Sequence, residues 1–479
     1  MPNPRPSSRP DAAPDVAWGT VAEIAAAVTN GGMTATAVVD QALARIAKLN
    51  PVLNAFTAVT AERARSRAKA IDSVSDRSRL PLAGVPFAVK NLFDVAGVVT
   101  TAGSKINRSN AAADRDSPLI ERLEAAGAVL VGALNMGEYA YDFTGENVHD
   151  GPSRNPHDTT RMTGGSSGGS GSAVAGGMVP FALGSDTNGS IRVPSSLCGI
   201  FGLKPTYGRL TRTRTFPFVF SLDHLGPFAR SVRDLALTYD AMQGPPGDDA
   251  ACAERPVEQV TRELDRGVNS LHIATAGGYF QKGAFPEAIE AIDSVAKALG
   301  VKQRVEFPEA ARARAAAYLI TATEGAALHL DRLRARANDF DPAVRDRLLA
   351  AAMVPSTLVV KAQTFRRWYR ERTLKLFEQV DAILAPATPC TAPKIGQTSF
   401  VLDGQELPVR PNLGLYTQPI SFIGLPVVAV PVPLKPLPIG VQIIAPPWRE
   451  DIALRVAYAL EQMGIVAAAR PIGLREHTS

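Results

Sequence analysis

The sequence predicts an α/β fold built on a large, twisted, mixed β-sheet that helices cover on both faces. Two observations carry this prediction. Helical patterns alternate with short apolar runs to the end of the chain, as in folds whose helices pack back onto a sheet. The apolar runs are hydrophobic at nearly every position, which is typical of strands buried on both faces.

The chain opens with helices and then changes to a strand. Thr20 and Glu23 form a capping-box pattern, and Thr34 can cap a second helix. The apolar run from residue 86 to residue 89 predicts a strand, which Lys90 directly follows. A charged amine at the end of such a strand is poorly solvated, which favours its neutral form.

Helix-to-strand units follow. Ser117 caps a helix that stops at Gly127, and residues 129–134 form a buried strand. A short helix in SGSAVAGGM precedes a strand in VPFALGS, and a helix in VRDLALTYDAMQG precedes a strand near LHIATAGGY.

Four later segments complete the prediction. DAILAPATP and VVAVPV are further strands, and KAQTFRRWYRERTLKLFEQ has the spacing of a helix with a solvated charged face. GPPGDDAACAERPVEQV is a surface loop.

Composition describes a globular protein. The 479 residues are 46% hydrophobic and 20% charged, well away from the composition of disordered chains. Residues 1–16 are rich in proline, serine and alanine and lack the apolar centre of a secretory signal. We expect a disordered tail there and a single domain over residues 17–479. Prolines interrupt the most apolar stretch, so we expect no membrane span.

Charge and cysteine usage exclude further classes. The 51 basic residues are nearly balanced by 46 acidic ones without a long basic run, so nucleic acid is not an expected partner. Cys198, Cys252 and Cys390 have no metal-binding spacing, which predicts reduced thiols in a cytoplasmic protein and no metal site.

The segment from Met162 to Ser190 is dense in glycine and serine but too apolar for a linker. It lacks the GxxxxGK[ST] pattern of a phosphate-binding loop, and Val174 stands where GxGxxG requires its third glycine. Ser167 is the centre of a G-x-S-x-G pattern, but the polar stretch before it lacks the pattern of the strand that a nucleophile elbow needs. A hydroxyl nucleophile with a desolvated lysine base, for which Lys90 is suited, is the third possibility.

The residues then carry a family resemblance. GGSSGGSGSAVAGGMVPFALGSDTNGSIRVPSSLCGIFGLKPTYGRL resembles the amidase signature family of serine hydrolases, and the likeness continues through GVPFAVKNLFDVAGVVTTAGS, GALNMGEYA, SRNPHD, SLDHLGPFARS and LPIGVQIIA. It implies Lys90 as the base, Ser166 as a serine after a cis peptide bond, and Ser190, 24 residues further on, as the nucleophile. It implies no cofactor. Glycines on both sides of Ser166 would let other backbone approach the serine loop closely.

The resemblance also implies an oxyanion hole and its support. The hole would consist of the backbone N–H groups of Thr187, Asn188, Gly189 and Ser190. Asp186 and Arg192 would pair to hold this loop, with Ser167 as a further supporting residue; a weak surface ion pair is the alternative. Many members have glycine where this chain has Asn188, and asparagine is the next most tolerant residue if that position needs a positive φ.

Several segments are most similar to the biuret and 1-carboxybiuret amidohydrolase group of the family, among them AGSKINR, ITATEGAALHLDRLR and TQPISFIGLPVV. The similarity implies hydrolysis of a small ureide with release of ammonia, and a catalytic subunit that works with a small helical partner in a heterotetramer. For a carboxylated ureide we expect an arginine or a cluster of donors in the pocket. Tyr141, His224 and Gln418 are candidate substrate contacts, although His224 alone is also typical of a structural histidine.

Two related activities and one different class are alternatives. The glutaminase component of glutamyl-tRNA amidotransferase has the same fold, but we expect glycine at position 188 and glutamine at position 224 in that group. A related amidase acting on oxalurate is the second alternative. A non-catalytic binding protein would lack the nucleophile or the base, and neither is missing here.

Overall fold

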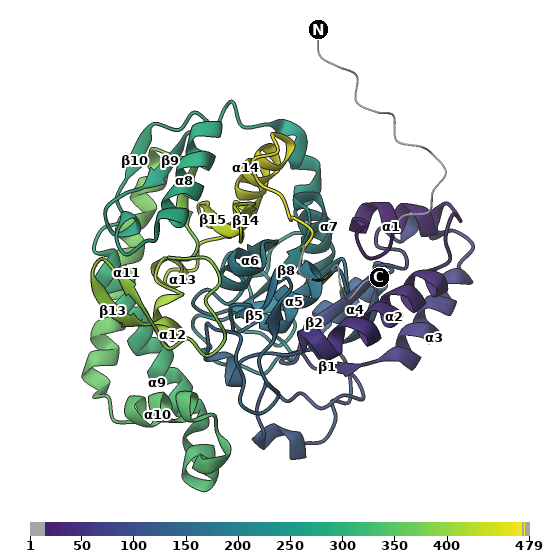
Figure 1. Ribbon diagram of the computed structural model, residues 1–479, viewed down its shortest axis with the longest axis horizontal. Coiled ribbons are helices and arrows are strands. Elements are labelled where there is room, and N and C mark those ends of the chain that lie inside the picture. Colours follow the sequence, from purple (N-terminus) through teal and green to yellow (C-terminus); the bar gives the residue numbers. More distant parts are fainter. Residues whose placement is uncertain (1–14, 472–473, 475–479) are drawn as a thin grey trace.

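The computed structural model describes residues 15–471 and residue 474. One 11-stranded sheet runs through it (Figure 1). In spatial order its strands are β1 (Phe56–Val59), β3 (Val129–Leu134), β2 (Pro86–Lys90), β6 (Phe181–Asp186), β8 (His224–Ala229), β7 (Phe201–Lys204), β14 (Val427–Val432), β15 (Ile439–Ile444), β11 (Ala382–Pro386), β9 (Ile273–Ala276) and β10 (Gln303–Val305). Strand β2 runs parallel to β3 and β6, and β9 runs parallel to β10 and β11, whereas the other pairs are antiparallel. The sheet is therefore mixed, as predicted.

Helices cover both faces of this sheet. Helix α5 (Gly168–Ala175) packs on α6 (Arg192–Cys198), and α7 (Val232–Met242) packs on α4 (Pro118–Ala125) and α14 (Glu450–Gln462). Strand β8 contacts both α5 and α7, and β14 contacts both α6 and α14. The two groups of helices thus lie on opposite faces, which confirms the predicted fold class.

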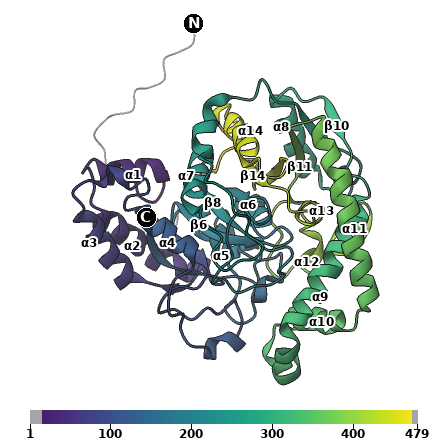
Figure 2. The ribbon, with the colours of Figure 1, turned by 180° about the vertical axis from the view of Figure 1, so that it is seen from behind.

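The remaining helices lie at the ends of the sheet. One end carries α1 (Val21–Thr29), α2 (Ala35–Leu53) and α3 (Ala61–Asp72), whereas α8 (Pro286–Ala298) packs on β11 and β15. Helices α9 (Ala310–Arg336), α10 (Pro342–Ala352) and α11 (Ser356–Leu374) form an arm on the side away from α1 to α3 (Figures 1 and 2). The short elements are α12 (Val409–Asn412), α13 (Gln418–Ser421) and the two-stranded pairs β4 (Arg154–Asn155) with β5 (Asp158–Met162) and β12 (Ser399–Leu402) with β13 (Gln405–Pro408).

Most of the predicted elements are present. The capping box of Thr20 and Glu23 forms at the start of α1, and the Thr34 side chain caps α2. Strand β2 continues one residue further than predicted, to Lys90. Ser117 occupies the predicted cap position of α4, but the predicted capping by its side chain is wrong. Its hydroxyl donates to Thr213 O (3.3 Å) and makes no cap hydrogen bond.

The predicted tail is only partly covered by the structure. Residues 1–14 lie outside the described residues, whereas Val16 is 4% exposed and belongs to the hydrophobic core. Residue 16 therefore does not belong to a disordered tail, and nearly all of the rest of this prediction lies outside the described residues. A single domain over residues 17–479 stays a prediction, which the continuous sheet supports.

Two further predictions can be compared with the described residues. All three cysteines are free and buried. No single helix in residues 15–471 is long and apolar enough to cross a membrane; α10 and α11 reach that length and composition only together, with a bend of 97° between them.

The sheet brings the serine segment to Lys90. Strands β2 and β6 are parallel neighbours, so their carboxyl ends, Lys90 and Asp186, meet at one edge of the sheet. The segment before α5 and the first turn of α5 lie at the same edge and are closely packed. A Cβ atom at Gly169 would lie 2.5 Å from both Ala55 O and Asn135 O, so only glycine fits there. The glycines therefore allow backbone to pack against backbone around the serines.

Candidate active site

Lys90 is a fully buried amine with two hydroxyl partners. Its Nζ lies 2.6 Å from Ser166 Oγ and 2.9 Å from Ser185 Oγ. Burial lowers the pKa of Lys90 to about 7, against the opposing effect of the carboxylates of Asp223, Asp186 and Asp142. A large fraction of the amine is consequently neutral near pH 7 and can accept a proton.

Ser166 and Ser167 are adjacent residues with different surroundings. The peptide bond between Gly165 and Ser166 is cis, and the Ser166 hydroxyl faces Lys90. Ser167 Oγ instead donates to Ser185 O at 3.2 Å and is fully buried. The serine at the centre of the G-x-S-x-G pattern thus binds the backbone of β6 and is not an exposed nucleophile.

Asp186 and Arg192 hold the loop between β6 and α6. The Asp186 carboxylate accepts hydrogen bonds from Arg192 Nε (3.0 Å), Arg192 Nη2 (2.9 Å) and the Ile191 N–H (3.1 Å). Arg192 also donates to Gln442 Oε1 (2.7 Å) and to the Ser421 hydroxyl. Both charged side chains are completely buried, so the alternative of a surface pair does not apply. Although burial by itself raises it, the pKa of Asp186 is lowered, chiefly by Arg192.

The loop that this ion pair holds exposes free backbone donors. Within the described residues, the N–H groups of Asn188, Gly189 and Ser190 make no hydrogen bond. Other groups of the loop are fixed: Thr417 Oγ1 donates to Asn188 O (2.6 Å), and Thr187 Oγ1 donates to the Asp223 carboxylate (2.6 Å). Three unused donors next to a serine hydroxyl can stabilise an oxyanion.

Ser190 faces a small cavity of about 20 Å³. Its polar lining is formed by Tyr141, Asp142, Thr187, Asn188, Ser190, Tyr318, Thr321, Arg347 and Gln418. This volume holds about one water molecule, so a larger ligand enters only when side chains move outward. Tyr318, which lines this cavity, is 37% exposed.

Two of the three predicted substrate contacts line this cavity. Tyr141 and Gln418 do, and Gln418 Oε1 accepts a hydrogen bond from Arg314 of α9 (2.9 Å). His224 does not line it, because its Nδ1 turns to Asp186 O (3.0 Å) and Leu222 O (2.6 Å) behind the loop. Burial holds the pKa of His224 well below its ordinary value, so the ring is neutral.

Arg347 is the cation of the cavity, and no local sequence signal identified it. Its guanidinium lies 3.7 Å from the centre of the Tyr141 ring and donates to the Tyr141 carbonyl. In the described part of the chain it has no carboxylate partner, whereas the nearby Asp142 pairs with Arg410 (2.5 Å). The expectation of an arginine in the pocket is thus met by a residue of α10, far from Ser190 in the sequence.

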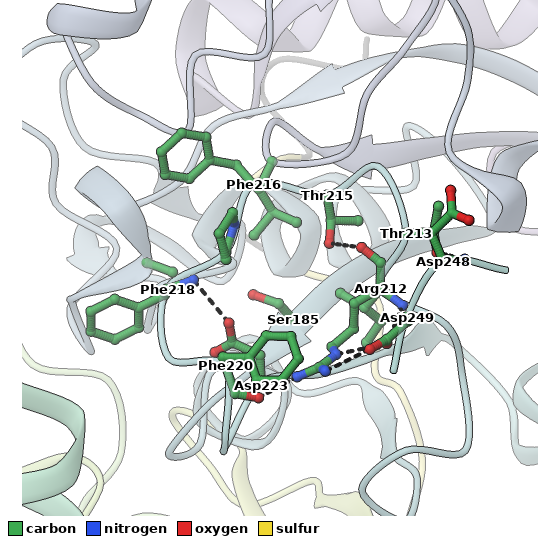
Figure 3. Close-up of a pocket in the computed structure, with 14 residues that line it drawn as sticks. Ser185, Arg212, Thr213, Thr215, Phe216, Phe218, Phe220, Asp223, Asp248 and Asp249 are labelled. Carbon is green, nitrogen blue, oxygen red and sulfur yellow. Dashed lines mark hydrogen bonds and ion pairs between the residues drawn. The ribbon is translucent and has the colours of Figure 1, made fainter. Parts of the chain in front are cut away.

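A second cavity, of about 200 Å³, lies on the other side of Phe218 and Ala140, which line both cavities. Figure 3 shows Ser185 near the middle of this lining, with Phe216 and Phe218 on one side and the ion pair of Arg212 with Asp249 on the other, beside Phe220. Since Ser185 is a partner of Lys90, this cavity adjoins the buried amine. Among the described residues, no group of three or more His, Cys, Asp or Glu side chains is arranged to hold a metal ion.

The fold, the buried lysine and the loop of free N–H groups define an amide hydrolase of the amidase family, to which this chain belongs. The family model described as Amidase matches residues 37–454.

Individual relatives cover nearly all of the chain. It is 52% identical over 448 residues to AtzE, the 1-carboxybiuret hydrolase component of Pseudomonas sp. (strain ADP), covering 92% of this chain and 98% of that protein. It is 35% identical to the A component of the glutamyl-tRNA(Gln) amidotransferase of Thioalkalivibrio sulfidiphilus (strain HL-EbGR7). That match covers 93% of this chain and 97% of the relative. One similar solved structure is described as an unexpected vestigial protein complex that reveals the evolutionary origins of an s-triazine catabolic enzyme. It matches this chain with a TM-score of 0.93 at 51% identity, and the match covers 94% of this chain and 100% of that chain.

Removing the Arg192 guanidinium should destabilise the fold strongly, because Asp186 would remain buried without its cation. We expect Arg192→Leu to lower the free energy of unfolding by about 3–5 kcal/mol, measured by urea titration. Arg367→Ala, which removes an exposed pair with Glu371, is the control and should cost less than about 1 kcal/mol. Equal losses in the two variants would contradict this account of the loop.

Proposed function

We propose that this enzyme hydrolyses the terminal amide of a small ureide, 1-carboxybiuret or biuret, and releases ammonia through an acyl-enzyme on Ser190. The observation that carries the proposal is the contact between the buried Lys90 amine and the Ser166 hydroxyl at 2.6 Å. A neutral amine in that contact can draw a proton through Ser166 from a second serine, and Ser190 is the serine beside the free N–H groups.

The proposed reaction has two halves. Ser190 Oγ attacks the amide carbon while its proton passes to Ser166 and from Ser166 to Lys90. The carbonyl oxygen becomes negative and receives the N–H groups of the loop from Thr187 to Ser190. The C–N bond then breaks, the leaving nitrogen takes a proton back through Ser166, and ammonia departs. Water next attacks the ester carbon, its proton takes the same route, and the acid leaves as Ser190 regains its hydrogen.

Two observations support a carboxylated ureide as the substrate: the position of Arg347 and the identity of the related proteins. An unpaired guanidinium beside the cavity suits a substrate that carries a carboxylate. The 1-carboxybiuret hydrolase component shares 52% identity with this chain, against 35% for the amidotransferase component. Oxalurate is also a carboxylated ureide, so it remains the alternative substrate. Ammonia release from 1-carboxybiuret, biuret, oxalurate, malonamide and glutamine distinguishes them.

We further propose that the enzyme works in the cytoplasm with a small helical partner protein, in a heterotetramer that contains two copies of this chain. The similar solved structure is described as a protein complex. The three free cysteines fit a reducing compartment. Size-exclusion chromatography with light scattering, with and without a small protein encoded nearby, tests the assembly.

Ser190→Ala should abolish ammonia release, because the acyl-enzyme cannot form. We expect a loss of at least about 10³-fold in kcat with an unchanged circular-dichroism melting curve, since only one hydroxyl is removed. Lys90→Ala should be nearly inactive as well. Near-normal turnover by Ser190→Ala would show that the nucleophile is a different group.

The activity should rise with pH through about 7. Protonated Lys90 cannot act as a base, so kcat/KM should increase as the amine loses its proton, reach half its plateau near its pKa of about 7, and stay level above it. Steady-state rates from about pH 5.5 to about pH 9 measure this profile. Lys90→Arg, which keeps the charge at every pH, should be inactive throughout; a flat profile in the unaltered enzyme would contradict the assignment.

Arg347→Leu should weaken carboxylate recognition selectively. We expect kcat/KM for 1-carboxybiuret to fall by about 10- to 100-fold, corresponding to the loss of one charge-assisted hydrogen bond, and that for uncharged biuret to change less than about threefold. Arg345→Leu, on the same helix but outside the cavity lining, is the matched control. Equal losses on both substrates would assign Arg347 a structural role only.

A further inference from the structure

The side chain of Asn188 is not needed for the oxyanion-binding role of the loop between β6 and α6. The loop can use its backbone N–H whatever the side chain is. The Asn188 Nδ2 donates to Thr321 Oγ1 of α9 at 2.7 Å, whereas its Oδ1 is buried and has no hydrogen-bond partner in the described part of the chain. The residue as a whole is only 6% exposed.

Backbone conformation does not explain why asparagine occupies this position. Asn188 is not among the described residues with a positive φ, whereas the next residue, Gly189, has a φ of 146°. Tolerance of a left-handed conformation, which the sequence suggested, is therefore not the reason for asparagine here. The reason must lie in what its amide group contacts.

The free end of this amide belongs to the wall of the substrate cavity. Asn188 lines the cavity together with Ser190, Thr321 and Arg347. The hydrogen bond to Thr321 fixes the amide between the loop and α9, so the oxygen is held in place and desolvated. A buried acceptor without a donor is unfavourable, and a ligand N–H that donates a hydrogen bond to this oxygen would remove that cost.

We propose that Asn188 Oδ1 accepts a hydrogen bond from the substrate N–H on the acyl side of the scissile carbonyl, opposite the leaving nitrogen, and so selects ureides over simple amides. The inference rests on the proposed function, since it assigns part of that substrate to a residue. The backbone N–H of Asn188 would meet the carbonyl oxygen while its side chain meets the neighbouring nitrogen. One residue would then recognise both the scissile C=O and an N–H on its non-leaving side, a pattern that ureides contain and simple amides lack.

Biuret and malonamide form a matched pair for the test, because they differ only in an N–H or a CH₂ between the two amide carbonyls. Their intrinsic reactivities differ, so the quantity to compare is the biuret-to-malonamide ratio of kcat/KM in each variant. We expect Asn188→Ala and Asn188→Leu to lower this ratio by at least about tenfold, with most of the loss on biuret. Both variants keep the backbone N–H of position 188.

Thr321→Val removes only the tether and should lower the ratio by a smaller factor of about two to five. Binding to the Ser190→Ala variant, measured by calorimetry, should show the same loss of biuret preference when Asn188→Ala is added.

An unchanged ratio, or equal losses on both diamides, would overturn the inference and leave Asn188 as a link between the loop and α9. If the unaltered enzyme releases ammonia from no ureide at all, the proposed function is wrong and the inference fails with it.

Discussion

The buried ion pair of Asp186 with Arg192 is the interaction on which the arrangement of this site depends. It joins the last residue of β6 to the first residue of α6, so the loop between them can take few conformations. Through Gln442 and Ser421, the same arginine ties this loop to β15 and α13, which are distant in the sequence. The free N–H groups therefore stay in place without hydrogen bonds of their own. Such preorganisation is what stabilisation of a developing oxyanion requires.

A second constraint is the dry surroundings of Lys90. Three carboxylates act to keep its amine charged, yet burial dominates and brings its pKa to about 7. The pKa is thus set by a balance, in which removal from water favours the neutral amine and the carboxylates oppose it. Ser166 and Ser185 satisfy the amine in either state, because hydroxyl groups can both donate and accept.

The sequence identified the sheet and the serine loop because their signals are local. The run at residues 129–134 matches β3 in full, and the residues from Lys90 to Ser190 form recognisable motifs. The substrate cavity could not be predicted in the same way. Arg347 and Thr321 come from the helical arm, and only the tertiary fold brings them to Ser190. The sequence left His224 open between a substrate contact and a structural histidine, because a motif does not show which way its side chain turns; in the structure its ring turns to Asp186 O.

The helical arm is attached to the core at the cavity and around it. Asp341 N–H donates to Glu138 (2.7 Å), Arg347 donates to the Tyr141 carbonyl, and Asn188 donates to Thr321. Lys90, the serines and the loop of free N–H groups thus belong to the sheet and its connections, whereas Tyr318, Thr321 and Arg347 in the wall of the cavity belong to the arm. Under the proposed function, substitutions in the arm would alter which substrate is accepted and leave the lysine and the serines in place. With this arrangement, a few sequence changes in the arm would be enough for a hydrolase of this fold to evolve activity on a different nitrogen compound.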